Sequence, residues 1–417
     1  MSATPLYVKP QDYAPPSVVG RMGSMAIIPG VLALVGIVVC AFIFPRGWII
    51  FLRAWLYAFL FWLGLSLGSL VLLMLQYTSG GNWGRVGRRF WEAAASLIPI
   101  MFLFWLPIAV GMKELYPWAS ISHEDAIKEF GQKAVIYLTP FGFWLRGIIY
   151  FIGWYALYWF LERWSEREEA GLTTPAQFVK IQNVSGAGIV FYAATITFAS
   201  IDWAMSLDPK WYSTVWGMIF MVGEVLTALC FTIWLLVKLA PMEPVSRMFK
   251  IDYLHDFGKL MFAFVVLWAY VSFSQWLIIW SGNLLVEIRW YLIRLRGGWQ
   301  YFGMLLIFVH FCFPFAVLLS RNIKRQGGRL VKIVFLLLLM RLIDLAWFTA
   351  PNFYPGGGEG RYGVADHFGP ADAIMYVLAP IAIGGIWLWA FFLRLSKRSL
   401  MPVNDPQFVE MLEAKHG

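Results

Sequence analysis

Long runs of apolar residues dominate this sequence. About ten of them reach the roughly 20 residues that a helix needs to cross the hydrocarbon core of a bilayer. Only 14% of the residues are charged, whereas soluble domains carry about a quarter. We therefore predict an all-α polytopic membrane protein with about ten transmembrane helices. The runs are residues 25–44, 48–76, 94–112, 139–161, 185–206, 214–237, 258–281, 300–320, 330–351 and 372–394.

Basic residues are concentrated in the loops on one side of these runs. That side holds both chain ends, and positively charged loops stay in the cytoplasm. We therefore place the N- and C-termini in the cytoplasm. We attribute the net charge of +9 to the basic cytoplasmic loops of a membrane protein rather than to nucleic-acid binding. The most basic loop, residues 321–332, is then cytoplasmic, and contact with anionic lipid is an alternative reason for its charge.

The expected organisation is one membrane domain between two polar ends. Residues 1–24 form a cytoplasmic N-terminal segment without the features of a secretory signal, residues 25–394 a single ten-helix domain, and residues 395–417 a cytoplasmic tail. We group the second to fifth and the sixth to ninth runs into two four-helix bundles, with the first and last runs peripheral. Two longer external loops, residues 113–138 and 351–371, suit either docking of an extrinsic partner or plain connection. Within the first, His123–Phe130 reads as a short surface helix.

Motifs for the common cofactors are missing from the sequence. The three cysteines, Cys40, Cys230 and Cys312, lie alone in apolar runs, so neither a metal-ligand set nor an iron–sulfur motif is formed. Only one of the five His, His310, lies deep in a run, which excludes a two-haem cytochrome b. There is no P-loop and no dinucleotide fingerprint. We expect no metal and no redox cofactor bound by this chain.

The charged residues inside the runs are the strongest functional signal. Each costs about 2.5–3.5 kcal/mol to insert at a helix centre, so each needs a reason. Helical rise places Glu224, His310 and Arg341 about 15 Å deep, near the middle of the bilayer. Asp344 follows Arg341 at the i, i+3 spacing of an intrahelical ion pair. Asp202 lies nearer the outer surface.

We hypothesise that these groups line a proton path or a polar pocket beside a quinone. The structural alternatives are an ion pair for Arg341 and Asp344, a core position for His310 and a helix brace for Asp202. Arg53 and Arg146 lie near the outer end of their runs and are expected to be structural charge partners. The full candidate set is Asp202, Glu224, Ser272, Gln275, His310, Arg341 and Asp344.

Four stretches resemble the membrane subunits of alternative complex III, which are related to the polysulfide-reductase (NrfD-like) membrane subunits, and the third of these stretches looks like the F type (ActF) rather than its paralogue ActC. They are residues 77–92, with Gly80-Gly81-Asn82-Trp83-Gly84 at their centre, residues 202–211, residues 255–283 and residues 401–406. The similarity extends over nearly the whole chain.

The resemblance implies a subunit of a complex in the bacterial inner membrane that oxidises a quinol and reduces a cytochrome c or a blue-copper protein. Haem c and iron–sulfur clusters would belong to periplasmic partner subunits, and an ActC-like membrane subunit would be a further partner besides lipid. The F-type subunit itself is implied in proton movement, in quinone binding or in scaffolding alone. A ten-helix secondary transporter is the alternative from a different class.

Overall fold

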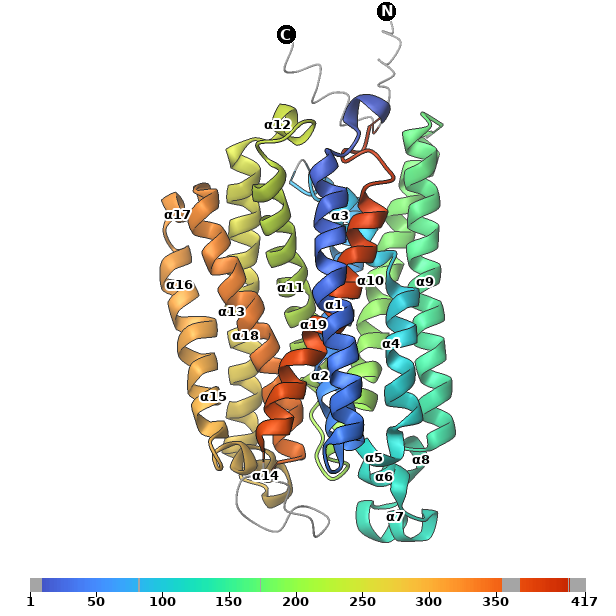
Figure 1. Ribbon diagram of the computed structural model, residues 1–417, viewed down its shortest axis with the longest axis vertical. Helices are drawn as coiled ribbons and strands as arrows, with labels where there is room; N and C mark the ends of the chain where they lie inside the picture. Colours follow the sequence, from blue (N-terminus) through green and yellow to red (C-terminus); the bar gives the residue numbers. More distant parts are fainter. Residues whose placement is uncertain (1–9, 82, 173, 355–367, 404, 406–417) are drawn as a thin grey trace, which may run out of the picture.

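The computed structural model is a bundle of long helices that run along one common direction (Figure 1). It describes residues 10–81, 83–172, 174–354, 368–403 and 405. Within these ranges every regular element is a helix, as the apolar runs predict.

Each of the ten apolar runs coincides with a long helix or a broken pair. Eight segments of the described chain are long and apolar enough to cross a membrane. α9 and α18 have 30 and 23 residues and lie alongside them, but α9 is less apolar and α18 carries Arg341 and Asp344. The long elements are α1 (Ser17–Ile43), α2 (Gly47–Ser79), α3 (Arg88–Ala95) with α4 (Ile98–Val110), α9 (Pro140–Glu169), α10 (Pro175–Trp203), α11 (Trp216–Leu239), α13 (Ile251–Gly282), α15 (Trp299–Leu305) with a π-helical segment (Leu306–Cys312) and α16 (Phe313–Leu318), α18 (Gly327–Thr349) and α19 (Pro370–Leu395).

Short helices fill the connections between the long ones. The prediction of a surface helix over His123–Phe130 is confirmed by α7, whose Ser122 cap accepts a hydrogen bond from the Asp125 amide. α14, in the turn after α13, was not anticipated. Residues 355–367 of the second external loop lie outside the described ranges. The short elements are η1 (Pro10–Tyr13), α5 (Met112–Leu115), α6 (Pro117–Ser120), α7 (His123–Phe130), α8 (Gln132–Tyr137), η2 (Met205–Leu207), α12 (Val245–Met248), α14 (Leu285–Arg294), α17 (Arg321–Arg325) and η4 (Ala350–Asn352).

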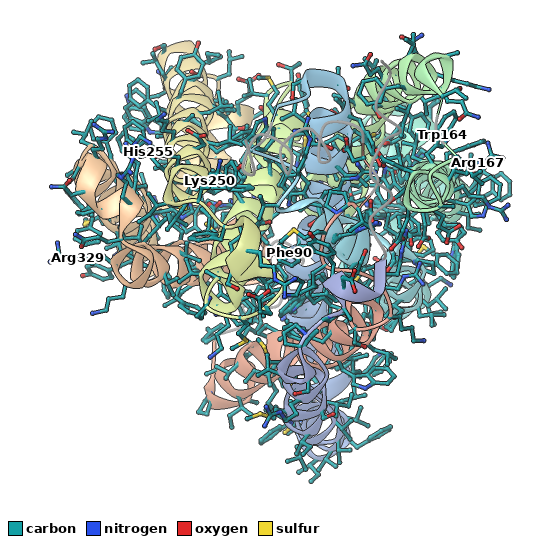
Figure 2. All side chains as sticks on the ribbon, turned by 90° about the horizontal axis from the view of Figure 1, so that it is seen from above. Phe90, Trp164, Arg167, Lys250, His255 and Arg329 are labelled. Carbon is teal, nitrogen blue, oxygen red and sulfur yellow. The ribbon has the colours of Figure 1, made fainter. Side chains whose placement is uncertain are left out.

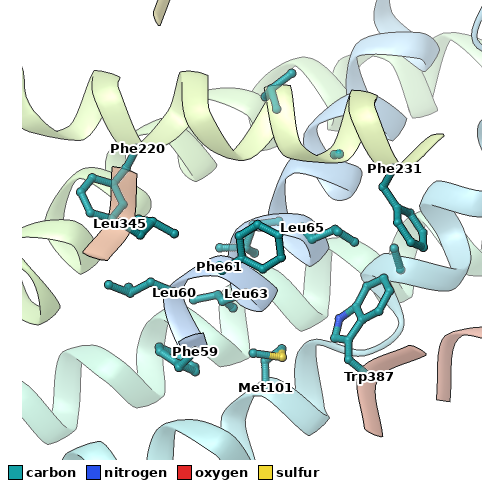
Figure 3. Packing of buried hydrophobic residues seen from close by; sticks show 14 of the residues in the cluster. Phe59, Leu60, Phe61, Leu63, Leu65, Met101, Phe220, Phe231, Leu345 and Trp387 are labelled. Atoms are coloured by element: carbon teal, nitrogen blue, oxygen red, sulfur yellow. The ribbon is translucent and has the colours of Figure 1, made fainter. Parts of the chain in front are cut away.

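The helices pack in three groups. α2, α4, α9 and α10 form one four-helix unit, α11, α13, α15–α16 and α18 form a second, and α1 pairs with α19 outside both. The same three lobes are visible along the bundle axis (Figure 2). This grouping agrees with the one expected from the order of the runs. The units meet where α11 packs against α2 and α10, and that contact forms the centre of the core, with Phe61 and Phe231 among its aromatic side chains (Figure 3).

The first and last described segments of the chain lie at the same end of the bundle. The Leu400 amide donates a hydrogen bond to the Tyr13 carbonyl, which joins the segment after α19 to the segment before α1. An even number of crossings requires this arrangement. Whether that end faces the cytoplasm remains a prediction.

A buried ion network closes this end of the bundle. The guanidinium of Arg88 on α3 pairs with Glu92 and Asp405, each at 3.2 Å, and with Glu168 on α9. Arg398 binds Glu169 at 2.7 Å. Although burial lowers the pKa of the Arg398 guanidinium, the nearby Glu92 and Glu169 carboxylates raise it above its ordinary value. The network therefore ties α3, α9 and the tail together through buried ion pairs.

Candidate functional site

A cavity of about 770 Å³ lies in the second helical unit. Its size is typical of a small-molecule site. Tyr270, Phe273 and Ile307 on its walls are more than half exposed, so the cavity opens onto the apolar surface of the bundle. Its lining comes from α11, α13, α14, α15, the π segment and α18, and is mostly aromatic or aliphatic: Ile219, Val266, Trp268, Ala269, Tyr270, Ser272, Phe273, Gln275, Trp276, Tyr291, Arg294, Leu295, Gln300, Gly303, Met304, Leu306, Ile307, Phe311, Cys312, Asp344, Trp347 and Phe348.

One face of α13 supplies polar groups to this apolar cavity. Trp268, Ser272 and Gln275 follow one another at spacings of four and three residues, which places them on one side of a helix. All three line the cavity. α13 thus carries a row of hydrogen-bonding groups along a wall that is otherwise apolar.

Asp344 of α18 forms the charged end of this wall. The Trp268 indole N–H donates to Asp344 Oδ2 over 3.1 Å, and Arg341 forms an ion pair with the same carboxylate. Asp344 is 1% exposed. The i, i+3 ion pair anticipated from the sequence is therefore present in the fold.

Three polar atoms at the cavity have no hydrogen-bond partner among the residues that the structure describes. They are Asp344 Oδ1, Ser272 Oγ and Trp347 Nε1. Buried polar atoms are nearly always paired, so such atoms call for a bound molecule or water. The hydroxyl and the indole N–H offer donors and the carboxylate oxygen offers an acceptor.

A second polar contact lies toward the end of the cavity nearer α14. Gln275 accepts a hydrogen bond from the Ser213 hydroxyl at 3.1 Å, and its amide donates to the Tyr291 hydroxyl at 3.3 Å. Burial raises the pKa of Tyr291 to about 12, so the phenol stays protonated. Arg294 donates to the Trp347 and Phe348 carbonyls at 3.0 and 2.7 Å, which fastens α14 to the end of α18.

His310 lies behind Trp268, in the π-helical segment. Its ring centroid is 4.1 Å from that of Trp268, and the residue is fully buried. Neither ring nitrogen makes a hydrogen bond of normal geometry to any described residue, although the Met340 carbonyl lies nearby. π segments inside α-helices recur at functional sites. Asp344 and His310 therefore share one neighbour, the Trp268 indole.

Glu224 of α11 lies deeper in the bundle. Its carboxylate accepts a hydrogen bond from the Tyr192 hydroxyl of α10 at 2.5 Å, and its stem packs against Gly64 of α2. Arg341 lies against Gly223, next to Glu224, and acts on that carboxylate electrostatically. A series of polar groups thus runs from Asp344 through Arg341 and Glu224 to Tyr192, in which Arg341 acts on Glu224 through its charge alone.

Asp202 belongs to a separate cluster at the C-terminal end of α10. It accepts hydrogen bonds from Arg146 at 2.7 and 2.9 Å and from the Tyr150 hydroxyl at 2.9 Å. Ten residues of α10, about 15 Å of helix, separate Asp202 from Tyr192. The structure does not bring Asp202 into contact with Glu224 or Asp344.

The two arginines assigned to structure differ in their contacts. Arg146 is the charge partner of Asp202. Arg53 lies over the rings of Phe353 and Tyr354, at 4.9 and 5.1 Å from their centroids. Both therefore lie against other parts of the chain at the end of the bundle opposite the ion network.

Several residues of the site escaped sequence reasoning. Tyr192, Trp268, Tyr291 and Trp347 are aromatic, and with 23 Trp and 18 Tyr in the chain no single one is distinctive. The one available signal for Trp268 was its place on the same helix face as Ser272. Among the described residues no three His, Cys, Asp or Glu side chains gather as metal ligands.

No protein-family model matches this chain, and no curated protein is significantly similar to it in sequence. The membrane-protein architecture therefore stands on the helices themselves, and the resemblance noted above remains an expectation.

Proposed function

We propose that this chain is a membrane subunit of a quinol oxidoreductase complex and that its cavity binds the quinone or quinol. The observation that carries the proposal is the combination of an apolar cavity open to the lipid side with three unused polar atoms on Ser272, Asp344 and Trp347. A quinone carries an apolar tail and a ring with polar oxygens, and it enters from the bilayer.

The polar atoms suit both redox forms of such a ring. The Ser272 hydroxyl and the Trp347 N–H donate to carbonyl or hydroxyl oxygens, and the Asp344 carboxylate accepts from a quinol hydroxyl. Oxidation of a quinol releases protons as well as electrons. The described chain offers carboxylates for the protons, whereas the electrons would pass to haem c and iron–sulfur clusters on partner subunits, as the resemblance to alternative complex III implies.

Proton translocation is the second part of the proposal. Asp344, Arg341, Glu224 and Tyr192 extend from the cavity into the middle of the bundle. Carboxylates and phenols linked in this way can pass protons if water joins the remaining gaps. Asp202 is not part of this set, so we assign it to bracing α9 against α10.

Binding is tested first on the full chain in detergent. Trp268, Trp276 and Trp347 line the cavity, so decylubiquinone or a short-chain menaquinone bound there quenches tryptophan fluorescence. We expect Ser272→Ala with Trp347→Phe, which removes two donors, to weaken binding about thirtyfold, since each hydrogen bond contributes about 1 kcal/mol. Asp202→Asn is the control and leaves binding unchanged. Equal quenching in all three proteins would refute a quinone site in this cavity.

Turnover is tested in the assembled complex. Asp344→Asn should lower quinol oxidation while assembly, followed by co-purified haem absorbance, is kept. Glu224→Gln should lower the number of protons moved per quinol oxidised. If both quinol oxidation and proton stoichiometry are unchanged in Glu224→Gln, the residue has no part in the mechanism.

The alternatives make different predictions. A scaffold subunit would lose assembly in these variants, with normal turnover in whatever complex remains. A secondary transporter would purify alone, without haem absorbance, and would have helices broken at corresponding places in two repeats. Within the described chain the break between α3 and α4 lies in the second helix of one unit, and the π segment lies in the third helix of the other. This mismatch favours the complex subunit.

A further inference from the structure

A group of basic side chains lies beside the cavity unit, at the end of the bundle that holds the ion network. Arg321, Lys324 and Arg325 come from α17, and Lys259 comes from the first turns of α13. All four lie near enough to His255 to act on it electrostatically. Figure 2 shows His255, Lys250 and Arg329 on this side of the molecule, away from Arg167.

Acidic neighbours neutralise only part of this charge. Asp252 binds Arg325 at 2.7 Å and Asp256 binds Lys259 at 3.1 Å. Arg321 and Lys324 have no ion-pair partner among the described residues. The basic group therefore keeps a surplus of positive charge.

Lys324 is the residue that points to a ligand. It is only 8% exposed, and its stem packs against Gly258, where an added Cβ would come within 3.0 Å of the lysine Cγ. Its ammonium is 5.5 Å from the centre of the Phe262 ring. Because most of the Lys324 side chain is covered, its ammonium has lost part of its water and gains from a charged partner. Burial and the nearby Lys259 lower the pKa of Lys324, and a bound anion would offset both effects.

The side chains around Lys324 are those of a surface that faces lipid. α17 begins directly after α16, whose last turn is followed by Leu319, 60% exposed. On the facing helix Ile251 is 46% exposed, and Phe262 and Phe315 pack with ring centroids 5.5 Å apart between α13 and α16. Basic groups thus border an apolar surface where the membrane-spanning helices end, which is the depth of phospholipid headgroups.

We propose that Lys324, Arg321 and Lys259 bind the phosphate of an anionic phospholipid, whose acyl chains lie along α13 and α16. The site is separate from the cavity, and its occupant is held by charge at the headgroup and by apolar contact along the tails. It does not depend on the function proposed for the cavity.

The experiment compares lipids on the detergent-solubilised full chain. Native mass spectrometry measures the binding of phosphatidylglycerol and of the zwitterionic phosphatidylcholine. We expect Lys324→Met, which keeps the packing stem, and Arg321→Gln each to weaken phosphatidylglycerol binding about fivefold, the contribution of one basic residue near an anionic lipid. Lys180→Met is the matched control, because Lys180 is exposed near the start of α10 in the other unit, and it leaves binding unchanged.

The possible outcomes separate the sources of the anion. Selective binding of phosphatidylglycerol that Lys324→Met and Arg321→Gln weaken supports the proposal. Equal binding of both lipids, or equal loss in Lys180→Met, overturns it. Inorganic phosphate is the third probe: if it protects the chain against thermal unfolding as well as phosphatidylglycerol does, and this protection depends on Lys324, the site binds free phosphate and the lipid proposal is wrong. Arg321 is exposed, so the Arg321→Gln variant keeps the test valid if Lys324→Met does not fold.

Discussion

Gly223 on α11 lies directly against the guanidinium of Arg341 on α18. A Cβ at this glycine would overlap the guanidinium. Only a residue without a side chain lets Arg341 lie in the α11–α18 interface, where it pairs with Asp344 and acts on Glu224. The absence of a side chain at Gly223 thereby lets Arg341 lie between Asp344 at the cavity and the carboxylate of Glu224.

The first prediction concerns this contact. Gly223→Ala should displace the Arg341 guanidinium and destabilise the chain by about 1–3 kcal/mol, the usual cost of an added methyl in a packed core. Gly186→Ala on α10 is the control, because nothing lies within 4 Å of its added Cβ. The measurement is unfolding in detergent followed by tryptophan fluorescence. Equal stability of the two variants would show that Arg341 is not held as described.

The second prediction concerns the ion network at the chain ends. Arg88→Gln removes the cation shared by Glu92, Glu168 and Asp405 and leaves buried carboxylates without it. Breaking a buried pair on one side costs about 3–5 kcal/mol. Arg167 is next to Glu168 in the sequence but is exposed, so Arg167→Gln should leave the unfolding free energy almost unchanged. Adding Glu168→Gln to Arg88→Gln should restore part of the lost stability, because the carboxylate left without its cation is then removed as well. If the two changes in unfolding free energy simply add, Arg88 and Glu168 do not act as a pair.

The third prediction separates the two acidic clusters. Asp202 is bound by Arg146 of α9, whereas Glu224 is bound by Tyr192, ten residues before Asp202 on α10. The effects of Asp202→Asn and Glu224→Gln on stability should therefore add within about 0.5 kcal/mol. A double-mutant cycle measures this directly. A coupling well above that value would mean that the two carboxylates belong to one network after all.

The fourth prediction concerns the Trp268 indole. Trp268→Phe keeps an aromatic ring but removes the donor to Asp344 Oδ2. Hydrogen bonds to charged groups contribute about 1.5–3 kcal/mol, so we expect a loss of stability in that range. Trp276→Phe, also on the cavity wall and 37% exposed, makes the same chemical change without losing a bond to Asp344. Similar unfolding curves for the two variants would contradict the role of this bond.

The fold was largely predictable because bilayer thickness sets helix length. The ten apolar runs, the grouping into two units and the α7 surface helix follow from hydrophobic runs and from the order in which they occur. Helix starts were less predictable: α3 begins at Arg88, six residues before the predicted start, and α10 begins at Pro175, ten residues before its own. The first turns of α3 read as a loop in the sequence because they hold the charged residues Arg88, Arg89 and Glu92. These charges are paired with one another only in the fold.

The site was predictable only in part. Arg341 and Asp344 share one helix, so spacing alone indicates their ion pair. The partner of Glu224, in contrast, is Tyr192, 32 residues earlier on another helix, and no local pattern encodes that pairing. The placement of Asp202 shows the same limit: its neighbour Arg146 lies 56 residues away on another helix, and no local pattern indicates that pairing.

The π segment around His310 has a further consequence for how this helix can change. A π turn accommodates one more residue than an α turn in the same stretch of helix. Deleting one residue between Leu306 and Cys312 would therefore let α15 and α16 join as one regular helix without altering the phase of either. The deletion would rotate the imidazole away from Trp268 while the outer contacts of both halves stay in register. A shorter chain that still folds would then show that the bundle itself does not need this extra residue.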